Sequence, residues 1–293
     1  MQTLKLENFA DYELIDCGDF EKLERFGQYI TIRPEPQAVW NRVLDYKEWE
    51  KLAHVKFMPK SSSSGEWKKL KQMPEQWPIN YTLPNKQKIT FRLGLTSFKH
   101  VGVFPEQAIN WNHICEKITD FSKQNKSGDI KFLNLFAYTG GASLAAKAAG
   151  ADVYHVDSIK QVITWGRQNM EMSNLNDIRW VVEDALKFVQ REIKRGNKYH
   201  GIILDPPAYG HGPNGEKWKL EDMIQDLIAK VIQLLHPENH FLILNSYSLG
   251  FSSLIIENLL KQNYNGPNKI EVGEIFIPSK SGVKLPLGVW GRI

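Results

Sequence analysis

Several features that would narrow the class of this protein are missing from its sequence. The 293 residues contain no apolar run near the roughly 20 residues that a membrane-spanning helix needs. The first residues, MQTLKLENFADYELIDCGD, lack the charged and then apolar pattern of a secretory signal. We therefore expect a cytoplasmic protein that makes no membrane contact.

Cysteine is scarce, and neither sign of charge dominates. Cys17 and Cys115 lie far apart and have no metal-ligand spacing, so we expect neither a disulfide framework nor a bound metal. The 37 basic and 33 acidic residues leave a net charge of +4, which permits a polyanionic partner without identifying one. The 42% hydrophobic and 24% charged residues are typical of a globular protein with one large or two ordinary domains.

The most informative stretch is FLNLFAYTGG, residues 132–141. Its first four residues predict a short strand that is buried on both faces. Gly140 and Gly141 then end the strand, and the small residues after them predict a helix. Because glycine lacks a Cβ, the backbone can turn sharply and approach a ligand, which the free N–H groups of the helix start would face. These features predict a ligand site, and a tight turn without a ligand is the alternative.

Strands and helices alternate through most of the chain after a first helix at about 108–123. This alternation predicts a parallel sheet with helices on both faces. Two strands at the end follow each other without a helix, so the last must run antiparallel. The predicted strands are 132–135, 152–156, 178–184, 199–207, 240–248, 269–278 and 285–293, and the predicted helices are 142–149, 159–174, 185–195, 221–235 and 252–262.

Residues 1–97 have a different character and predict a small β-rich N-terminal domain, which we expect to assist substrate recognition. Short β-prone pieces such as QYITIRP and KITFRL lie there, with four of the nine tryptophans. One helix is also expected, because four apolar residues have roughly helical spacing: Val39, Val43, Leu44 and Leu52. The second domain is expected to span residues 98–293.

Residues 56–71, KFMPKSSSSGEWKKLK, join a serine run to lysines around Trp67. We interpret them as a mobile basic loop that could contact phosphate while the indole stacks on an unpaired base. A solvated loop without a partner is the alternative.

An acidic residue follows the second strand of the alternating region. Asp157 lies 17 positions after Gly140 (157 − 140 = 17), close to the roughly 20 at which an acid in dinucleotide-binding folds meets ribose hydroxyls. A carboxylate can accept both hydroxyl protons, so Asp157 is a candidate ribose ligand. Capping of the following helix is the alternative role.

The run LNLFAYTGG, with HVDS after it and ILDPPAYG further on, resembles the class I S-adenosylmethionine (SAM) dependent methyltransferases. Within them it is most similar to the family of large-subunit ribosomal RNA methyltransferase I and its relatives, over about residues 98–293. The resemblance implies an enzyme with a Rossmann-like α/β domain, which uses SAM and releases S-adenosylhomocysteine. It also implies an RNA substrate, with ribosomal RNA first among the candidates.

The resemblance further implies a set of cofactor contacts. An acid after the third strand would accept a hydrogen bond from the adenine amino group, and Ile159 would form an apolar wall for adenine. Helix capping by Asp184 and a core contact of Ile159 are the alternatives, and residues 104–107 could instead be a linker. The candidate cofactor-binding residues are Phe104, Glu106, Gln107, Phe136, Ala137, Tyr138, Thr139, Gly140, Gly141, Asp157, Ser158, Ile159, Asp184, Ala185 and Asp205.

The fourth strand ends in DPPAYG, which resembles the N/D-P-P-aromatic motif of amino-methylating relatives. In them the motif accepts hydrogen bonds from the target amine and stacks a ring on the base. We therefore name Asp205, Pro206, Pro207 and Tyr209 as candidate catalytic residues. Ala208 separates the prolines from the aromatic ring, which departs from that motif and leaves the methylated atom open. A rigid turn without substrate contact is the alternative.

Relatives that methylate pyrimidine C5 use a cysteine at the end of the fifth strand, where this sequence has NSYS, residues 245–248. The resemblance therefore favours direct transfer to nitrogen or oxygen, without a cysteine nucleophile or a metal. The alternatives are a protein or small-molecule acceptor, or a non-catalytic SAM-binding protein that binds RNA. A nicotinamide-dependent oxidoreductase is disfavoured, because YTGGAS does not supply the G-x-G-x-x-G turn. The oligomeric state stays open.

Overall fold

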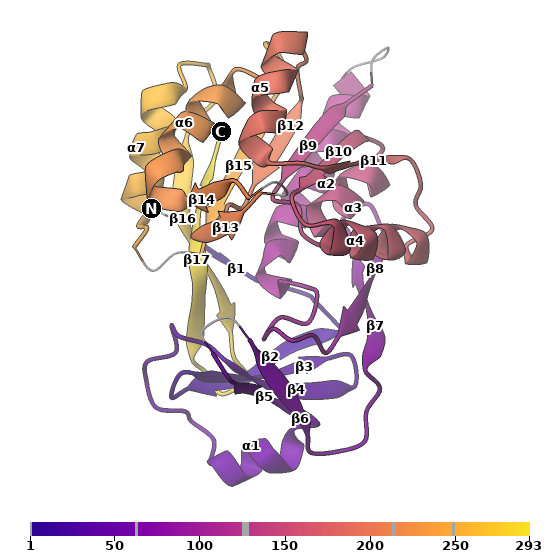
Figure 1. The fold of residues 1–293 in the computed structure, drawn as a ribbon, viewed down its shortest axis with the longest axis vertical. Coiled ribbons are helices and arrows are strands. Elements are labelled where there is room, and N and C mark those ends of the chain that lie inside the picture. The colour runs from indigo at the N-terminus through magenta and orange to yellow at the C-terminus, as the bar shows by residue number, and fades with distance from the viewer. Residues whose placement is uncertain (1, 62–63, 125–128, 213–214, 248–249) are drawn as a thin grey trace.

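The computed structural model describes residues 2–61, 64–124, 129–212, 215–247 and 250–293. In this part of the chain, an α/β region stands above a smaller β-rich region (Figure 1). None of the helices in the described ranges is both long and apolar enough to cross a membrane.

The α/β region is organised around an eight-stranded sheet. Its strand order is β1-β16-β17-β15-β12-β9-β10-β11. Only β17 runs against the others, so the predicted Rossmann-like, mostly parallel sheet with an antiparallel last strand is confirmed. The strands are β1 (Gln2–Lys5), β9 (Lys131–Leu135), β10 (Asp152–Asp157), β11 (Ile178–Val182), β12 (Gly201–Leu204), β15 (Phe241–Ser246), β16 (Glu271–Pro278) and β17 (Lys284–Arg292).

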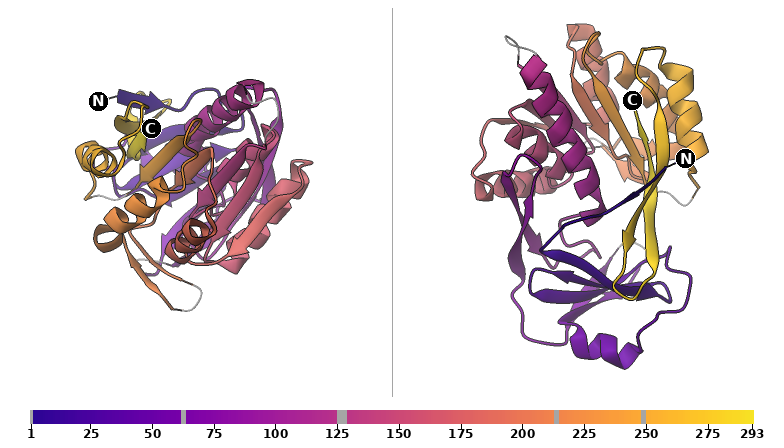
Figure 2. Two further views of the ribbon diagram at one scale, coloured as in Figure 1. Left: turned by 90° about the horizontal axis from the view of Figure 1, so that it is seen from above. Right: turned by 180° about the vertical axis from the view of Figure 1, so that it is seen from behind.

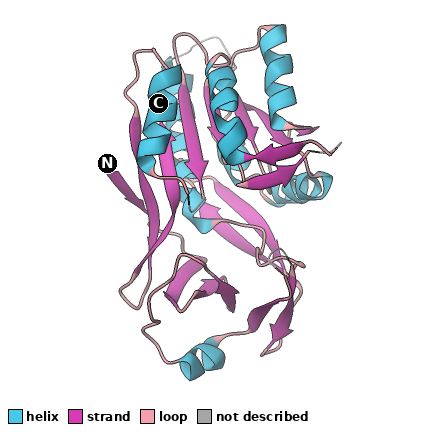
Figure 3. Cartoon of the chain, turned by 60° about the vertical axis from the view of Figure 1, so that its left-hand side comes forward, coloured by secondary structure: helices cyan, strands magenta, loops and turns pink. Residues whose placement is uncertain are grey.

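Helices cover both faces of this sheet (Figure 3). The reason is visible along β9, where Phe132 is buried in one hydrophobic cluster and Leu133 in the other. Since successive strand residues point to opposite faces, a strand with apolar residues on both faces needs a cover on each side. The clusters include residues of α2 and α3 on one face and of α5, α6 and α7 on the other. The helices are α2 (Ala108–Gln124), α3 (Gly141–Ala148), α4 (Lys160–Met172), α5 (Ala185–Arg195), α6 (Leu220–Ile232) and α7 (Ser253–Asn263).

The β-rich region contains a five-stranded sheet and one short helix, α1 (Tyr46–Leu52). The predicted apolar face of that helix is wrong. Val39 and Val43 precede the helix and are 67% and 57% exposed, while Trp49 is fully buried. Asp45 starts the helix by accepting a hydrogen bond from the backbone N–H of Lys47. The strands are β2 (Tyr12–Gly18), β3 (Glu21–Phe26), β4 (Tyr29–Pro34), β5 (Val55–Pro59) and β6 (Gly65–Lys69).

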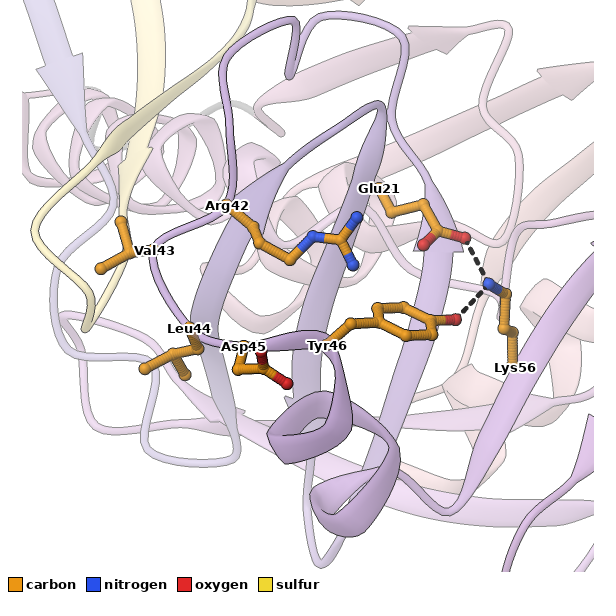
Figure 4. A pocket seen from close by; sticks show the side chains of 7 residues that line it. All are labelled: Glu21, Arg42, Val43, Leu44, Asp45, Tyr46 and Lys56. Carbon is orange, nitrogen blue, oxygen red and sulfur yellow. Dashed lines mark hydrogen bonds and ion pairs between the residues drawn. The ribbon is translucent and has the colours of Figure 1, made fainter.

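The basic loop predicted at residues 56–71 is also wrong, because β5 and β6 form an antiparallel hairpin there. Ser62 and Ser63 lie outside the described residues. Lys56 lines a surface depression of about 830 Å³. Figure 4 shows its ammonium group near Glu21 and Tyr46. The Lys56 Nζ lies 2.8 Å from a Glu21 carboxylate oxygen, so this cation is neutralised within the protein.

The two regions are joined by more than one crossing of the chain. The turn between β16 and β17 reaches down to β2, where Lys280 N–H donates to the Leu14 carbonyl at 2.9 Å (Figure 2). The hairpin of β7 (Gln76–Thr82) and β8 (Lys88–Gly94) is bonded to α4, since Asn169 accepts from the backbone N–H of Arg92. The boundary between residues 97 and 98 stays a prediction, and β1, β7 and β8 before it all bond to the α/β region.

Candidate active site

A cavity of about 550 Å³ lies between the carboxyl ends of the parallel strands and the β-rich region; we call it the sheet-edge cavity. Its walls come from β3, β4, β16 and β17, from the segment before α2, and from the ends of β9, β10, β12 and β15 with the loops after them. Ligands of open α/β sheets bind at this edge. The predicted site residues that line it are Phe104, Glu106, Gln107, Phe136, Tyr138, Asp157, Ser158, Ile159, Asp205, Pro206, Pro207 and Tyr209.

The glycine turn after β9 lies beside a second space of about 60 Å³, which Ala137, Thr139, Gly140 and Gly141 line. Gly140 has φ +92° at the N-cap of α3, a conformation that favours glycine. At Gly141, a Cβ would lie 2.6 Å from the ring of Trp111, so the helix start packs closer than any side chain permits. The sharp turn therefore depends on both glycines.

Two non-glycine residues of this turn also have positive φ, at +55° for Phe136 and +50° for Tyr138. Such conformations cost energy and persist only where the surroundings enforce them. The backbone N–H of Tyr138 donates to Asp157 at 2.9 Å, and the hydroxyl of Thr139 donates to the Gly102 carbonyl at 2.7 Å. These bonds tie the turn to β10 and to the segment before α2.

Asp157 forms hydrogen bonds with the backbone around it, as its alternative capping role predicts. One carboxylate oxygen accepts from Tyr138 N–H and the other from Ile159 N–H, both at 2.9 Å. Each oxygen has a second acceptor position, so the capping contacts leave room for hydroxyl donors. Burial raises the pKa of Asp157 above its ordinary value. Its ribose role stays a prediction that the geometry permits.

Two of the predicted cofactor-binding residues line neither the sheet-edge cavity nor the smaller space beside the glycine turn. Asp184 caps α5 by accepting a hydrogen bond from Lys187 N–H at 3.0 Å, and Ala185 is buried in the first turn of that helix. Ile159, by contrast, is 53% exposed and lines the sheet-edge cavity, so it is not a core contact of α4.

A chain of buried amides fixes the orientation of Asp205. Gln107 Nε2 donates to Asp205 Oδ2 at 3.2 Å, and Gln107 Oε1 accepts from Asn110 and Asn245 at 2.9 and 3.1 Å. Asn110 Oδ1 in turn accepts from the guanidinium of Arg292 at 2.8 Å. Because arginine can only donate, each amide has one allowed orientation, and Gln107 must present its NH₂ group to Asp205. Asp205 is therefore held as a hydrogen-bond acceptor.

Two carboxyl groups in the cavity have strongly raised pKa values. Burial raises the pKa of Asp205 to about 6 and that of Glu106 to about 7. Such shifts often occur at functional sites, although buried ion-pair networks cause them too. At neutral pH, Asp205 is mostly ionised and can accept a hydrogen bond or a proton.

The segment after Asp205 continues into a hairpin of β13 (Tyr209–His211) and β14 (Lys217–Lys219). Pro213 and Asn214 lie outside the described residues. The indole N–H of Trp218 donates to the Pro207 carbonyl at 2.6 Å, which fixes the proline turn. Tyr209 is 70% exposed at the cavity mouth.

Sequence reasoning missed the wall that the β-rich region contributes. Arg33 lies 2.6 Å from Glu24, Lys22 lies 3.1 Å from Glu35, and the hydroxyl of Tyr247 donates to Glu35. All four charged residues lie in or just after β3 and β4 and are almost fully buried. Lys22 and Glu24 are two residues apart and therefore lie on one face of a strand. This spacing of opposite charges was the sequence feature that could have indicated the buried ion pairs.

Comparison with known proteins agrees with this geometry. A sequence model of the S-adenosylmethionine-dependent methyltransferase family matches residues 51–262. The crystal structure of the SAM-dependent methyltransferase from Agrobacterium tumefaciens is 34% identical and has a TM-score of 0.91, covering 100% of this chain and 93% of that one.

Curated relatives include a ribosomal RNA large subunit methyltransferase K/L from Pseudoalteromonas translucida, which is 29% identical over 163 residues. The match covers 53% of this chain and 21% of that protein. The protein of the same name from Pseudoalteromonas atlantica is 23% identical over 266 residues, or 83% of this chain and 35% of that one. This chain therefore matches only a minor part of these longer relatives.

Proposed function

Because this chain belongs to the S-adenosylmethionine-dependent methyltransferase family, we propose that it transfers a methyl group from SAM directly to RNA, with ribosomal RNA as the acceptor. The family match gives the enzyme class and the cofactor. The acceptor rests on the names of the curated relatives and on one observation, the basic residues that line the same cavity as Asp205. A cytoplasmic location and the absence of a metal belong to the same proposal.

The sheet-edge cavity suits SAM in size and chemistry, since ligand cavities commonly measure about 300 to 1,000 Å³. When bound, SAM supplies a methyl group carried on a positively charged sulfur. Asp157 would hold the ribose hydroxyls with its remaining acceptor positions, and Ile159 at the cavity mouth would cover the adenine. Phe104 and Tyr138, whose rings lie 5.2 Å apart, would exclude water from the cofactor.

Asp205 is the residue that we assign to the acceptor. Its Oδ2 is occupied by Gln107, and its Oδ1 has no partner in the described chain, so it can accept a hydrogen bond from an acceptor N–H or O–H group. The exposed ring of Tyr209 would stack on the acceptor base. Positioning of this kind is the main contribution that a methyl transfer requires of the protein.

A cysteine nucleophile has no place in this proposal. Cys17 and Cys115 are fully buried and neither lines the sheet-edge cavity. Burial raises the pKa of the Cys17 thiol to about 12, so the thiolate that covalent catalysis needs is disfavoured. Both observations support direct transfer.

The test is transfer of a labelled methyl group from SAM by the purified protein to ribosomal RNA, total cellular protein and a small-molecule extract. We expect the label in RNA, in one methylated nucleoside identified by mass spectrometry after digestion. The same nucleoside should be missing from cells without the gene. The variant Asp205→Asn should retain affinity for S-adenosylhomocysteine and lose most of the transfer.

Other outcomes identify the alternatives. Label in protein or in a small molecule would refute the RNA acceptor while leaving the enzyme class intact. Binding of S-adenosylhomocysteine and RNA without any transfer would indicate a non-catalytic binding protein.

A further inference from the structure

The cations that line the sheet-edge cavity all lie on the wall opposite the carboxyl ends of the parallel strands. The carboxyl ends of the strands contribute Asp157 and Asp205, whereas the opposite wall contributes three cations together with Glu35 and Glu106. The cations are Lys22 and Arg33 from the β-rich region and Lys99 from the segment before α2. A ligand with both positive and negative groups would therefore be oriented across the cavity.

Two of the three cations are neutralised within the protein. Arg33 lies 2.6 Å from a Glu24 oxygen, and Lys22 lies within 3.5 Å of oxygens of both Glu24 and Glu35. Lys99 forms no ion pair within 4 Å with any residue that the structure describes. Glu35 and Glu106 line the same cavity, and of the three cations only Lys99 is without an ion pair among the described residues.

Lys99 is nevertheless held in place. Its backbone carbonyl accepts a hydrogen bond from the guanidinium of Arg33 at 3.1 Å. The next residue, His100, packs edge-on against Phe104 at 5.0 Å, and the Phe104 ring lies 5.2 Å from Tyr138 in the glycine turn. The backbone of Lys99 is therefore tied to both walls.

The surroundings of Lys99 favour an anion. The pKa of Lys99 is lowered chiefly by burial; the charges of Lys22 and Arg33 lower it further, while the more distant carboxylates of Glu35 and Glu24 oppose the shift. An anionic ligand would relieve this repulsion and compensate the lost hydration. His100 cannot supply a second cation near neutral pH, since burial lowers its pKa to about 3.

We propose that Lys99 binds an anionic oxygen group inside the sheet-edge cavity, either the α-carboxylate of SAM or a phosphate of the RNA acceptor. A half-buried lysine without a protein partner, on the cation-bearing wall of a cavity that takes a zwitterionic cofactor, is suited to this contact. Binding of the carboxylate requires only that the protein binds SAM, the cofactor of its family. Binding of a phosphate rests on the proposed function, in which the acceptor is RNA.

The first experiment compares two ligands by calorimetry. S-adenosylhomocysteine carries the carboxylate, and 5′-methylthioadenosine has the same nucleoside without the amino-acid part. If Lys99 binds the carboxylate, Lys99→Gln should weaken S-adenosylhomocysteine binding about 10- to 100-fold and leave 5′-methylthioadenosine binding unchanged. Lys117→Gln, an exposed lysine of α2 outside the cavity, is the matched control and should alter neither affinity.

The second experiment measures binding of a ribosomal RNA fragment, with S-adenosylhomocysteine present, at several salt concentrations. If Lys99 binds a phosphate, Lys99→Gln should leave the calorimetry unchanged and reduce the salt slope of RNA binding by about 1. Lys99→Arg keeps the positive charge and should preserve the affinity that Lys99→Gln weakens, whether for S-adenosylhomocysteine or for RNA. Unchanged affinities for both ligands and an unchanged salt slope, in a variant with a normal melting temperature, would overturn the proposal.

The wild-type protein separates this inference from the proposed function. S-adenosylhomocysteine binding without methylation of RNA would refute the RNA acceptor. The calorimetric comparison of the two ligands would still test whether Lys99 binds the carboxylate. Labelled RNA together with a Lys99→Gln variant that behaves like Lys117→Gln would refute only the role of Lys99.

Discussion

Replacing Asp205 with asparagine is expected to make the protein more stable and the enzyme less active. Burial raises the pKa of Asp205 from 3.8 to about 6, so the fold opposes ionisation of this carboxyl group. The difference corresponds to roughly 3 kcal/mol at most. An asparagine carbonyl could still accept the hydrogen bond from Gln107, and the side chain would carry no charge.

The sign follows from the two pKa values. In the unfolded chain the carboxyl group ionises above about pH 4, and in the folded protein only above about pH 6. Between these values a rising pH favours the unfolded state, so the wild type loses stability there and the Asp205→Asn variant does not. We expect equal free energies of unfolding near pH 4, and a variant that is up to about 3 kcal/mol more stable at pH 7.5.

Urea denaturation of both proteins at pH 4 and pH 7.5 measures this difference, and methyl transfer is followed at the same pH values. Transfer by the wild type should fall as pH drops through about 6, because protonated Asp205 no longer accepts from the acceptor. Asp120→Asn, on the exposed face of α2, is the control and should change stability by less than about 0.5 kcal/mol. A variant that is less stable than the wild type at pH 7.5, or as active, would refute the reasoning.

The sequence was sufficient to predict the α/β fold, because mostly apolar strands alternate along the chain with segments of helical length. The same reasoning failed at α1. Val39 and Val43 have helical spacing but are exposed, while Trp49 anchors the helix in the core. A short amphipathic pattern cannot reveal which of its faces meets a sheet, since that depends on strands elsewhere in the chain.

In the candidate site too, residues within local motifs were predicted and contacts between distant parts of the chain were not. Residues within one strand exit, such as Asp157 and Asp205, were predicted because a local motif carries them. The opposite wall was missed because its contacts join distant parts of the chain, such as Tyr247 with Glu35. These two residues are 212 positions apart, and no local pattern links them.

Three further substitutions test the contacts around the cavity. Gly141→Ala would place a Cβ 2.6 Å from Trp111, so the free energy of unfolding should fall by about 1–3 kcal/mol in urea denaturation; an unchanged value would mean that the ring can move. Tyr247→Phe removes the hydroxyl that donates to Glu35 across the cavity and should lower thermal stability by about 1–3 kcal/mol, whereas equal melting would show that the contact is dispensable. Asp157→Ala removes the acceptor of two backbone N–H groups together with the candidate ribose contact, so both stability and cofactor affinity should decrease. Each hydrogen bond to a charged group is worth about 1.5–3 kcal/mol, which predicts at least tenfold weaker S-adenosylhomocysteine binding by calorimetry at a temperature where the variant is folded. A lower melting temperature with unchanged affinity would instead assign Asp157 to the turn alone, and the ribose contact would have to come from another residue.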